Sequence, residues 1–301
     1  MKPPCQPHVR DMPRLLAFRS PLSSFRFSSA FTLIELLVAA TISMFLVGLL
    51  LMAVQGISTS YTRTQANITR QGDAAFALDQ VVQDLEGYVV PNFAAGEAIR
   101  ATPETVGETT NAIWLTLLST AVDADNSNVN GTNNFSGATR AISYRLAYQN
   151  TISTNSPGTD PTFAIYRSIS SAKHTFANVS SATTNMQSQY WGSIAASPSP
   201  APPAPTAIGN FLAENVVGFS VRFLYLDSSG AEKWTSSSDV VRIGRDGATI
   251  NGAAIAGGLK RAEVSLTILS PEGAQRLKAG LPLSEAISRY GKTSVRQTAF
   301  F

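Results

Sequence analysis

The sequence has little of the chemistry that disulfides, metal centres and catalytic sites require. It contains one cysteine, Cys5, and two histidines, His8 and His174. Cys5 and His8 both lie within the first 30 residues, so the chain beyond them has no cysteine and one histidine. That part therefore has no disulfide, no thiolate metal site and no cysteine nucleophile. His174 lies in a Ser-rich segment without an acid or nucleophile at a recognisable spacing, which favours a solvated loop residue over a catalytic base.

Charged residues are also scarce, at 14% of the chain, and they nearly balance. The formal net charge is +3, from 23 Lys and Arg against 20 Asp and Glu. Five of the basic residues and one of the acidic residues lie in the first 30 positions, so residues 31–301 have a net charge of −1. This gives no global electrostatic reason to bind a phosphate backbone, and we expect no nucleic-acid partner. No Gly-rich phosphate loop, nucleophile elbow or paired-carboxylate motif stands out, and we expect a protein that is not an enzyme.

One long hydrophobic run dominates the sequence. It extends over Phe31–Val54, and no charged residue occurs from Leu36 to Thr62. Because a helix needs about 20 apolar residues to cross a bilayer, the run predicts a transmembrane helix. Glu35 is the exception, since a carboxylate at the edge of a hydrocarbon core is costly without a partner. Either Glu35 snorkels at the interface of a plain membrane anchor, or it has a functional partner.

The flank before this run is basic. Its single acid is Asp11, and its five basic residues are Lys2, Arg10, Arg14, Arg19 and Arg26. Positive charge directly before a span keeps that end in the cytoplasm and places the chain after Val54 on the far side. A secretory signal has its small-residue cleavage site after the apolar region, whereas Ser28-Ser29-Ala30 precedes it here. The order of the segments therefore argues against an ordinary signal peptide.

The stretch Phe31-Thr-Leu-Ile-Glu-Leu-Leu-Val-Ala39 resembles the amino-terminal motif of type IV pilins and type II secretion pseudopilins. The resemblance implies that a prepilin peptidase cuts between Ala30 and Phe31 and methylates the new amino terminus. The family usually has Gly before the cut, where this chain has another small residue, Ala30. Glu35 then becomes the fifth mature residue, at which the family has an acid.

The resemblance also implies a role for Glu35 and a set of partners. Cleavage creates a positive amine at Phe31, which Glu35 of a neighbouring subunit can neutralise in a filament. A buried pair of this kind fixes register more than it adds net stability. The implied location is the inner membrane, with the amino terminus in the cytoplasm and the head in the periplasm, assembled in a pseudopilus or filament. The implied partners are other pilins or pseudopilins, prepilin peptidase and the membrane itself.

The helix is predicted to continue beyond the membrane. Residues 31–56 form the transmembrane or filament-core part, and residues 57–90 form an amphipathic continuation that ends before Pro91. Apolar residues recur at helical spacing in the second part. Its polar residues are expected on the opposite face: Asp73, Gln80, Gln83 and Asp84. The apolar stripe is then free to pack against a globular head, residues 91–301.

The head is predicted to be mostly antiparallel β structure. Short apolar or alternating runs indicate strands at Ile113–Leu118, Ile142–Gln149, Phe163–Ile169, Phe219–Tyr225 and Ala262–Ile268. Asp227-Ser-Ser-Gly230 predicts a turn toward Trp234, and Glu272–Lys278 predicts a short helix. Ser284–Phe301 has no clear assignment. The predicted fold class is therefore α+β and pilin-like, with a long N-terminal helix packed by a β head.

Residues 197–205 are rich in Pro, Ser and Ala and predict a stiff, exposed segment. It is either a linker between two β subdomains or a surface loop in one sheet system. The pattern of Leu212–Asp227, Trp234 and Ala262–Leu269 resembles the head of the larger minor pilins and J-type minor pseudopilins, which place two small β-sheets on a long helix. A further resemblance is to the Verru_Chthon cassette protein C group, which has the same prepilin start and no assigned biochemical role.

Two polar segments of the head are candidate binding sites. Asp123-Ala-Asp-Asn-Ser-Asn-Val-Asn-Gly131 places Asp123 and Asp125 among amides at alternate positions, which suits the oxygen ligands of calcium. The twelfth position is Asn134 rather than a bidentate Glu, so a solvated Asn-rich loop is the favoured alternative to a metal site. The segment Asp239–Gly247 predicts a turn with a local ion pair.

These patterns predict a non-enzymatic assembly protein, a minor pilin or pseudopilin of a type II secretion pseudopilus or type IV pilus-like filament. No cofactor is expected, and calcium at Asp123 and Asp125 is the less favoured alternative to a solvated loop. Two alternatives stay open. A DNA-binding minor pilin would show salt-sensitive DNA affinity, and the near-neutral charge argues against it. An uncleaved single-span membrane protein with a β head would keep residues 1–30.

Overall fold

A computed structural model describes residues 32–90, 96–120, 139–149, 161–170, 175, 186–187 and 210–299. Several predicted features lie outside the described residues: the cleavage site at Ala30 and Phe31, the calcium candidates Asp123 and Asp125, His174, and segment 197–205. The chain divides into two units, Met1–Ser58 and Thr59–Phe301.

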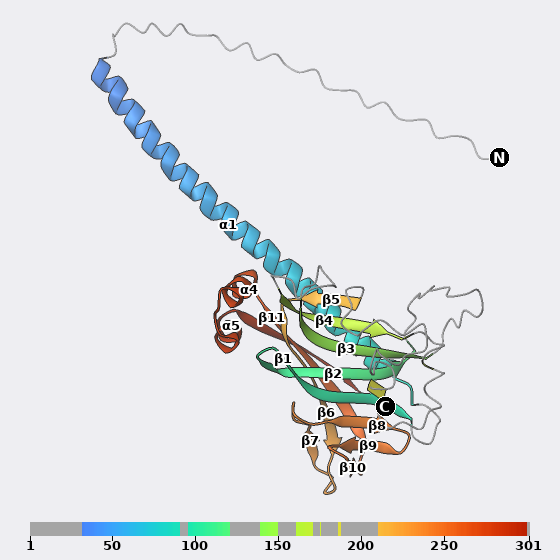
Figure 1. The fold of residues 1–301 in the computed structure, drawn as a ribbon. Helices are drawn as coiled ribbons and strands as arrows, with labels where there is room; N and C mark the ends of the chain where they lie inside the picture. Colours follow the sequence, from blue (N-terminus) through green and yellow to red (C-terminus); the bar gives the residue numbers. More distant parts are fainter. Residues whose placement is uncertain are drawn as a thin grey trace, which may run out of the picture. The chain divides into compact units, whose positions relative to one another are not determined.

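One helix, α1 (Leu33–Glu86), contributes residues to both units (Figure 1). Its 54 residues include no proline, and among the described helices it alone is long and apolar enough to cross a membrane. The helix ends at Glu86 rather than near residue 90. The cause is a turn at Gly87, after which Tyr88 forms an isolated antiparallel bridge with Ser119.

The described strands of the second unit form one 12-stranded sheet network. Its long path has the order β10 (Ala253–Ile255), β9 (Gly247–Ile250), β8 (Val241–Gly244), β1 (Glu97–Val106), β2 (Thr109–Ser119), β3 (Arg140–Gln149), β4 (Thr162–Ile169) and β5 (Phe211–Glu214). A second path has the order β7 (Glu232–Trp234), β6 (Val216–Leu226), β11 (Leu259–Leu269) and β12 (Gly291–Ala299). The paths meet in one parallel pair, Ala112 with Phe219, and all other pairings are antiparallel. The described head is therefore one connected sheet system in one unit.

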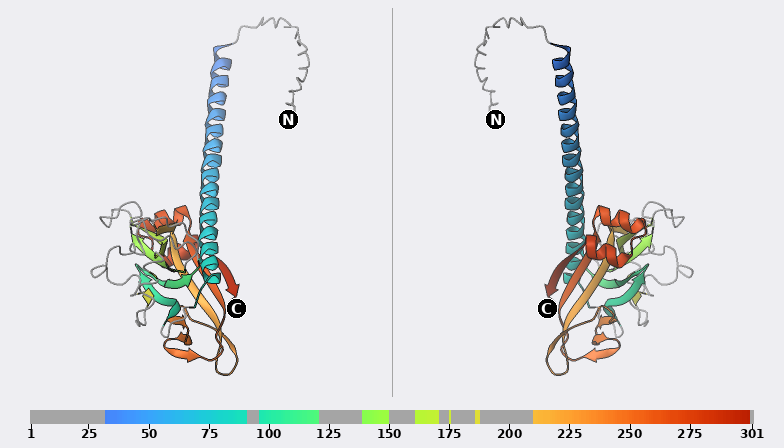
Figure 2. Two further views of the ribbon diagram at one scale, coloured as in Figure 1. Left: turned by 90° about the vertical axis from the view of Figure 1, so that its right-hand side faces the viewer. Right: turned by 90° about the vertical axis from the view of Figure 1, so that its left-hand side faces the viewer.

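The core lies between α1 and this sheet. β2 and β3 are buried along most of their length, and Leu115 and Tyr144 are among their fully buried residues. The second half of α1 adds a helical stripe to the same core: Ala74, Ala77, Leu78, Val81 and Leu85. Figure 2 shows the last turns of α1 beside the strands in both views. Burial of this stripe holds the helix to the sheet.

The long apolar helix and the large antiparallel sheet confirm the α+β class. Each predicted strand lies within an observed one, namely β2, β3, β4, β6 or β11. The predicted short helix is α4 (Pro271–Lys278), whose start is capped by Ser270 because its Oγ accepts from the Gly273 N–H at 3.1 Å.

Several parts of the head went unpredicted, among them β1 and β5. The unassigned end folds as α5 (Leu283–Tyr290) and β12. β8, β9 and β10 form a meander whose second turn is Asn251-Gly252, with φ of 50° and 83°. An Asn-Gly pair between short apolar runs is a strong hairpin signal because both positions need positive φ.

Candidate functional site

Thr32 and Glu35 close the start of α1 as a capping box. The backbone N–H and the hydroxyl of Thr32 both donate to Glu35 Oε2, at 3.0 and 2.9 Å. In return, the Glu35 N–H donates to Thr32 Oγ1 at 3.4 Å. This is the Thr-x-x-Glu pattern, in which donors at a helix start are satisfied reciprocally. Both bonds are made to Oε2, so among the described residues Oε1 of Glu35 accepts no hydrogen bond.

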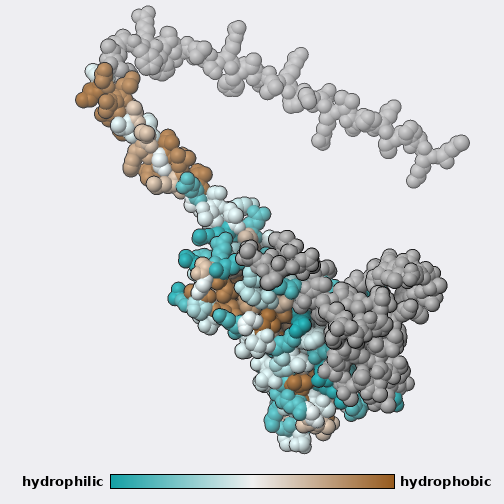
Figure 3. All heavy atoms as spheres, viewed as in Figure 1, coloured by the Kyte–Doolittle hydropathy of each residue, from teal (hydrophilic) through white to brown (hydrophobic). Residues whose placement is uncertain are grey.

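The part of α1 in the first unit is apolar and uncovered by any described residue. Its large apolar side chains are exposed, from Leu33 at 83% to Val54 at 53%. In Figure 3 much of this part of the helix is brown, the colour of hydrophobic residues, with paler residues between. Apolar surface of this extent is stable only where a bilayer or another protein removes it from water.

The second half of α1 places a buried acid, Asp84, against the sheet. Asp84 is 2% exposed, and Arg167 of β4 donates to it from Nε at 2.9 Å and from Nη2 at 3.1 Å. The hydroxyl of Tyr144 on β3 donates a short hydrogen bond to the same carboxylate. The prediction that Asp84 lies on the outward polar face is therefore wrong. Asp84 follows Ala77 by seven residues, or about two helical turns, so it lies on the buried stripe, where Arg167 neutralises it.

The pKa values of Tyr144 and Arg167 are both raised at this site. Burial and the neighbouring Asp84 carboxylate raise the pKa of the Tyr144 hydroxyl well above 10, so Tyr144 keeps its proton and donates. Burial lowers the pKa of Arg167, but the hydrogen bonds and charges of Asp84 and Tyr144 outweigh that effect, and the net shift is upward. The site therefore holds one buried ion pair and one neutral hydroxyl donor.

Further contacts between α1 and the sheet surround the Asp84–Arg167 pair. Arg70 of α1 donates to the Leu269 carbonyl at 3.3 Å. Asp79 of α1 lies 3.1 Å from Arg296 of β12, and both side chains are more than half exposed. An exposed pair of this kind contributes little stability. The face of the helix that meets the sheet carries both the buried apolar stripe and the Asp84–Arg167 pair.

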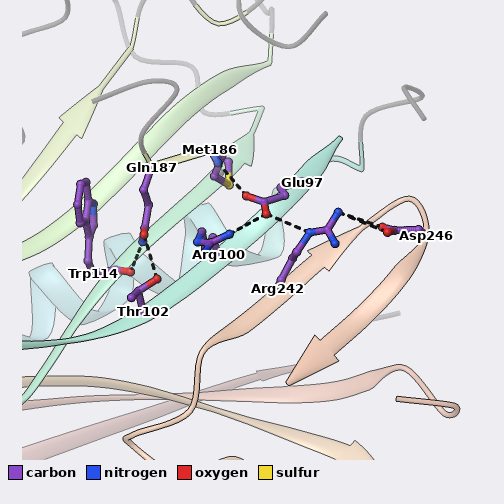
Figure 4. Close-up of polar contacts among 8 residues, drawn as sticks. All are labelled: Glu97, Arg100, Thr102, Trp114, Met186, Gln187, Arg242 and Asp246. Carbon is purple, nitrogen blue, oxygen red and sulfur yellow. Dashed lines mark hydrogen bonds and ion pairs between the residues drawn. The ribbon is translucent and has the colours of Figure 1, made fainter. Parts of the chain in front are cut away.

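A second buried carboxylate, Glu97 at the start of β1, is the centre of another cluster of polar contacts (Figure 4). Its Oε1 lies 2.8 Å from Arg100 Nη1 and 3.0 Å from Arg242 Nε, and its Oε2 accepts from the Met186 N–H at 2.8 Å. The predicted ion pair in segment 239–247 is confirmed, since Arg242 Nη2 is 3.4 Å from Asp246. Two acids and two arginines thus balance in charge within the cluster.

The same cluster fastens residues 186–187 to the sheet. The Gln187 side chain donates to the Trp114 carbonyl at 2.7 Å and accepts from the Thr102 hydroxyl at 2.9 Å (Figure 4). Met186 packs with Leu118 and Ala141 in a small apolar cluster of its own. These contacts have a structural role, because the polar groups of residues 186–187 form hydrogen bonds with other residues of the chain.

No family model, curated protein or solved structure matches the chain. Within the described ranges, no three His, Cys, Asp or Glu side chains come together as a metal site requires. Among the described residues, the arrangement offers an exposed apolar helix with one acid at its start, whose second half packs against a β-sheet.

Sequence reasoning missed the roles of several site residues, among them Thr32, Asp84, Arg167 and Glu97. Thr32 had a readable signal, since Thr-x-x-Glu before an apolar run is a capping-box pattern. The seven-residue spacing from Ala77 was the signal for the burial of Asp84. Arg167 had none, because its contact with Asp84 spans 83 positions of sequence.

Proposed function

We propose that the protein is a non-enzymatic structural subunit of the minor pilin or pseudopilin kind. A prepilin peptidase cleaves it between Ala30 and Phe31, and it assembles into a type II secretion pseudopilus or type IV pilus-like filament. It enters the inner membrane with its amino terminus in the cytoplasm and its head in the periplasm. Its partners are the peptidase and other pilins or pseudopilins.

The observation that carries the proposal is the uncovered first part of α1 with Glu35 at its start. A helix that serves only as a membrane anchor needs about 20 apolar residues and no acid. An acid placed there is costly unless a partner neutralises it. Thr32 satisfies Oε2 alone, and Oε1 is directed at no described group, which leaves one carboxylate oxygen for a partner from outside the subunit.

The mechanism is packing followed by charge pairing. The bilayer covers the apolar part of α1 before assembly, and neighbouring helices cover it afterwards. Cleavage gives Phe31 a positive amine, and Oε1 of Glu35 on an adjacent subunit accepts from it. Two groups that are each costly in apolar surroundings thereby neutralise each other and fix the register between subunits. The head, held to the same helix through Asp84 and Arg167, determines which subunits fit beside it.

Co-expression with a prepilin peptidase tests the processing step. We expect the product to begin at Phe31 with a methylated amine, as read by amino-terminal sequencing and mass spectrometry. Ala30→Gly should be cleaved at least as well, because Gly is the usual residue in the family, and Ala30→Leu should remain uncleaved. Ser24→Leu, a change of similar size away from the cut, serves as the control. A parent chain that keeps Met1 beside an active peptidase would refute the proposal.

A second candidate function has one observation in its favour. The capping box already satisfies part of Glu35 within the chain, as an uncleaved single-span protein with a β head would require. In that case the same experiment returns the intact amino terminus for the parent chain and for all three variants.

A further inference from the structure

β12 is the longest edge strand of the described sheet. The described network ends in four terminal strands, of which β5 has 4 residues, β7 has 3 and β10 has 3, whereas β12 has 9. Natural sheets commonly keep their edges short, because an exposed strand is a template for pairing with another chain. Three edges of this sheet follow that rule, and β12 does not.

The backbone of β12 is regular enough to accept another strand. It pairs with β11 through nine successive residues without a register shift, from Gly291 opposite Leu269 to Ala299 opposite Arg261. In an antiparallel pair, every second residue turns its N–H and C=O away from the partner. Within the described part of the chain, β11 is the sole strand that pairs with β12. Figure 2 shows β12 at the margin of the sheet, beside the end of α1.

The side chains of β12 indicate what kind of strand fits. The strand carries two cations, Lys292 and Arg296, and no acid. Arg296 is paired with Asp79, but no described acid pairs with Lys292. Val295, in the middle of the strand, is 48% exposed. Cross-strand neighbours stabilise a sheet when charges are opposite and β-branched residues meet, so the complementary strand has an acid beside Lys292 and a β-branched residue beside Val295.

We propose that the outer edge of β12 binds an extended acidic segment of another protein by strand addition. Backbone hydrogen bonds supply the attraction, and Lys292 and Val295 select the sequence. A second copy of β12 is a poor occupant, because it would bring together two strands whose charges are all positive. The same cations thus oppose self-pairing and favour an acidic partner. The binding requires neither cleavage at Ala30 nor filament assembly, so its test stands apart from the proposed function.

A peptide probe tests the proposal on the full chain in detergent micelles. The probe is a fluorescent peptide of about nine residues, the length of β12, in which Val or Thr alternates with Glu. Fluorescence anisotropy should show saturable binding with a dissociation constant below about 1 mM. The same peptide N-methylated at every amide keeps its charges but has no N–H to donate, so it should not bind.

Matched charge reversals locate the site. Lys292→Glu should weaken binding of the acidic probe roughly five- to tenfold, and Arg276→Glu, an exposed change on α4, should alter it by less than about twofold. A probe with Lys in place of Glu should bind Lys292→Glu better than the parent. The proposal is overturned if the N-methylated probe binds as well as the parent probe, if both reversals weaken binding equally, or if no probe binds saturably.

Discussion

Asp84 in the second half of α1 and Glu35 in the first half differ in which residues neutralise or hydrogen-bond their carboxylates. In the second half, Asp84 is buried, and the sheet supplies Arg167 and Tyr144 to neutralise and hydrogen-bond it. In the first half, Glu35 lies on an exposed apolar helix, and among the described residues its side chain is held by Thr32 alone. An acid in apolar surroundings needs a partner, and where the fold provides one the acid is structural. Under the proposed function, this difference arises because the partner of Glu35 comes from another subunit.

Removing the Asp84 carboxylate should have the largest effect on the folded head. Asp84→Ala leaves Arg167 buried without its counter-charge, which typically costs about 3–5 kcal/mol. Chemical denaturation of the full chain in detergent measures the loss. Asp79→Ala, which removes an exposed ion pair from the same helix, should cost less than about 1 kcal/mol. Equal losses in the two variants would mean that burial does not distinguish these acids.

Removing the Glu35 carboxylate should act on assembly and leave the head unchanged. Glu35→Ala should insert into the membrane normally but reach the filament at a level about tenfold lower than the parent, because its helix no longer offers a partner to the Phe31 amine. Quantitative immunoblotting of membrane and filament fractions measures both steps. Glu285→Ala, which removes a surface acid paired with Arg289, is the control and should assemble normally. Normal assembly of Glu35→Ala would contradict the proposal that Glu35, unlike Asp84, pairs with another subunit.

Tyr144→Phe should lower the free energy of unfolding of the head by less than Asp84→Ala does. At neutral pH we expect a cost of about 1–3 kcal/mol, since a hydrogen bond to a charged group is lost. The pKa of Tyr144 is raised in the folded state, so its contribution is complete below about pH 10 and is lost as the pH rises toward the folded-state value. Denaturation measured between about pH 8 and 11 should therefore show a steeper alkaline loss in the parent than in Tyr144→Phe. Parallel profiles would mean that Tyr144 is not the titrating group.

Thr32→Val should have the smallest effect, confined to the first turn of α1. It removes the hydroxyl that holds Glu35 Oε2, and loss of an N-cap typically costs about 1 kcal/mol of local helix stability. Amide exchange of the first turn should quicken while the stability of the head stays unchanged. Thr41→Val is the control, because the Thr41 hydroxyl donates to the Val38 carbonyl within the helix and caps nothing. Equal exchange in both variants would show that the capping box is weak in the membrane environment.

Sequence patterns found the elements whose signals are local. The charge-free run after Glu35 predicts a long helix, and alternation predicts β3, β6 and β11, because burial on one face repeats at a fixed period. Asn251-Gly252 was a local signal as well, but its flanking runs are only a few residues long and were not recognised as strands. β12 reads as polar and weakly patterned, since it is an edge strand that buries little.

The buried contacts were beyond local patterns. Arg167 contacts Asp84, and Glu97 contacts Arg242, only because the sheet order brings distant strands and the helix together. Asp84 was assigned to the wrong face because its charge was given more weight than its seven-residue spacing from Ala77, which places it on the buried stripe. Among the described residues, Oε1 of Glu35 accepts no hydrogen bond. This depends on the orientation of the side chain, which the spacing of residues in the sequence does not give.

The mass of the protein isolated from its own host tests the central claim most directly. If Glu35 pairs with a newly formed amine, the native chain must begin at Phe31 and carry one added methyl group. Intact-mass and amino-terminal peptide measurements on the membrane or filament fraction determine this without any variant. A native chain that still contains residues 1–30 would contradict the account and leave a membrane-anchored β head.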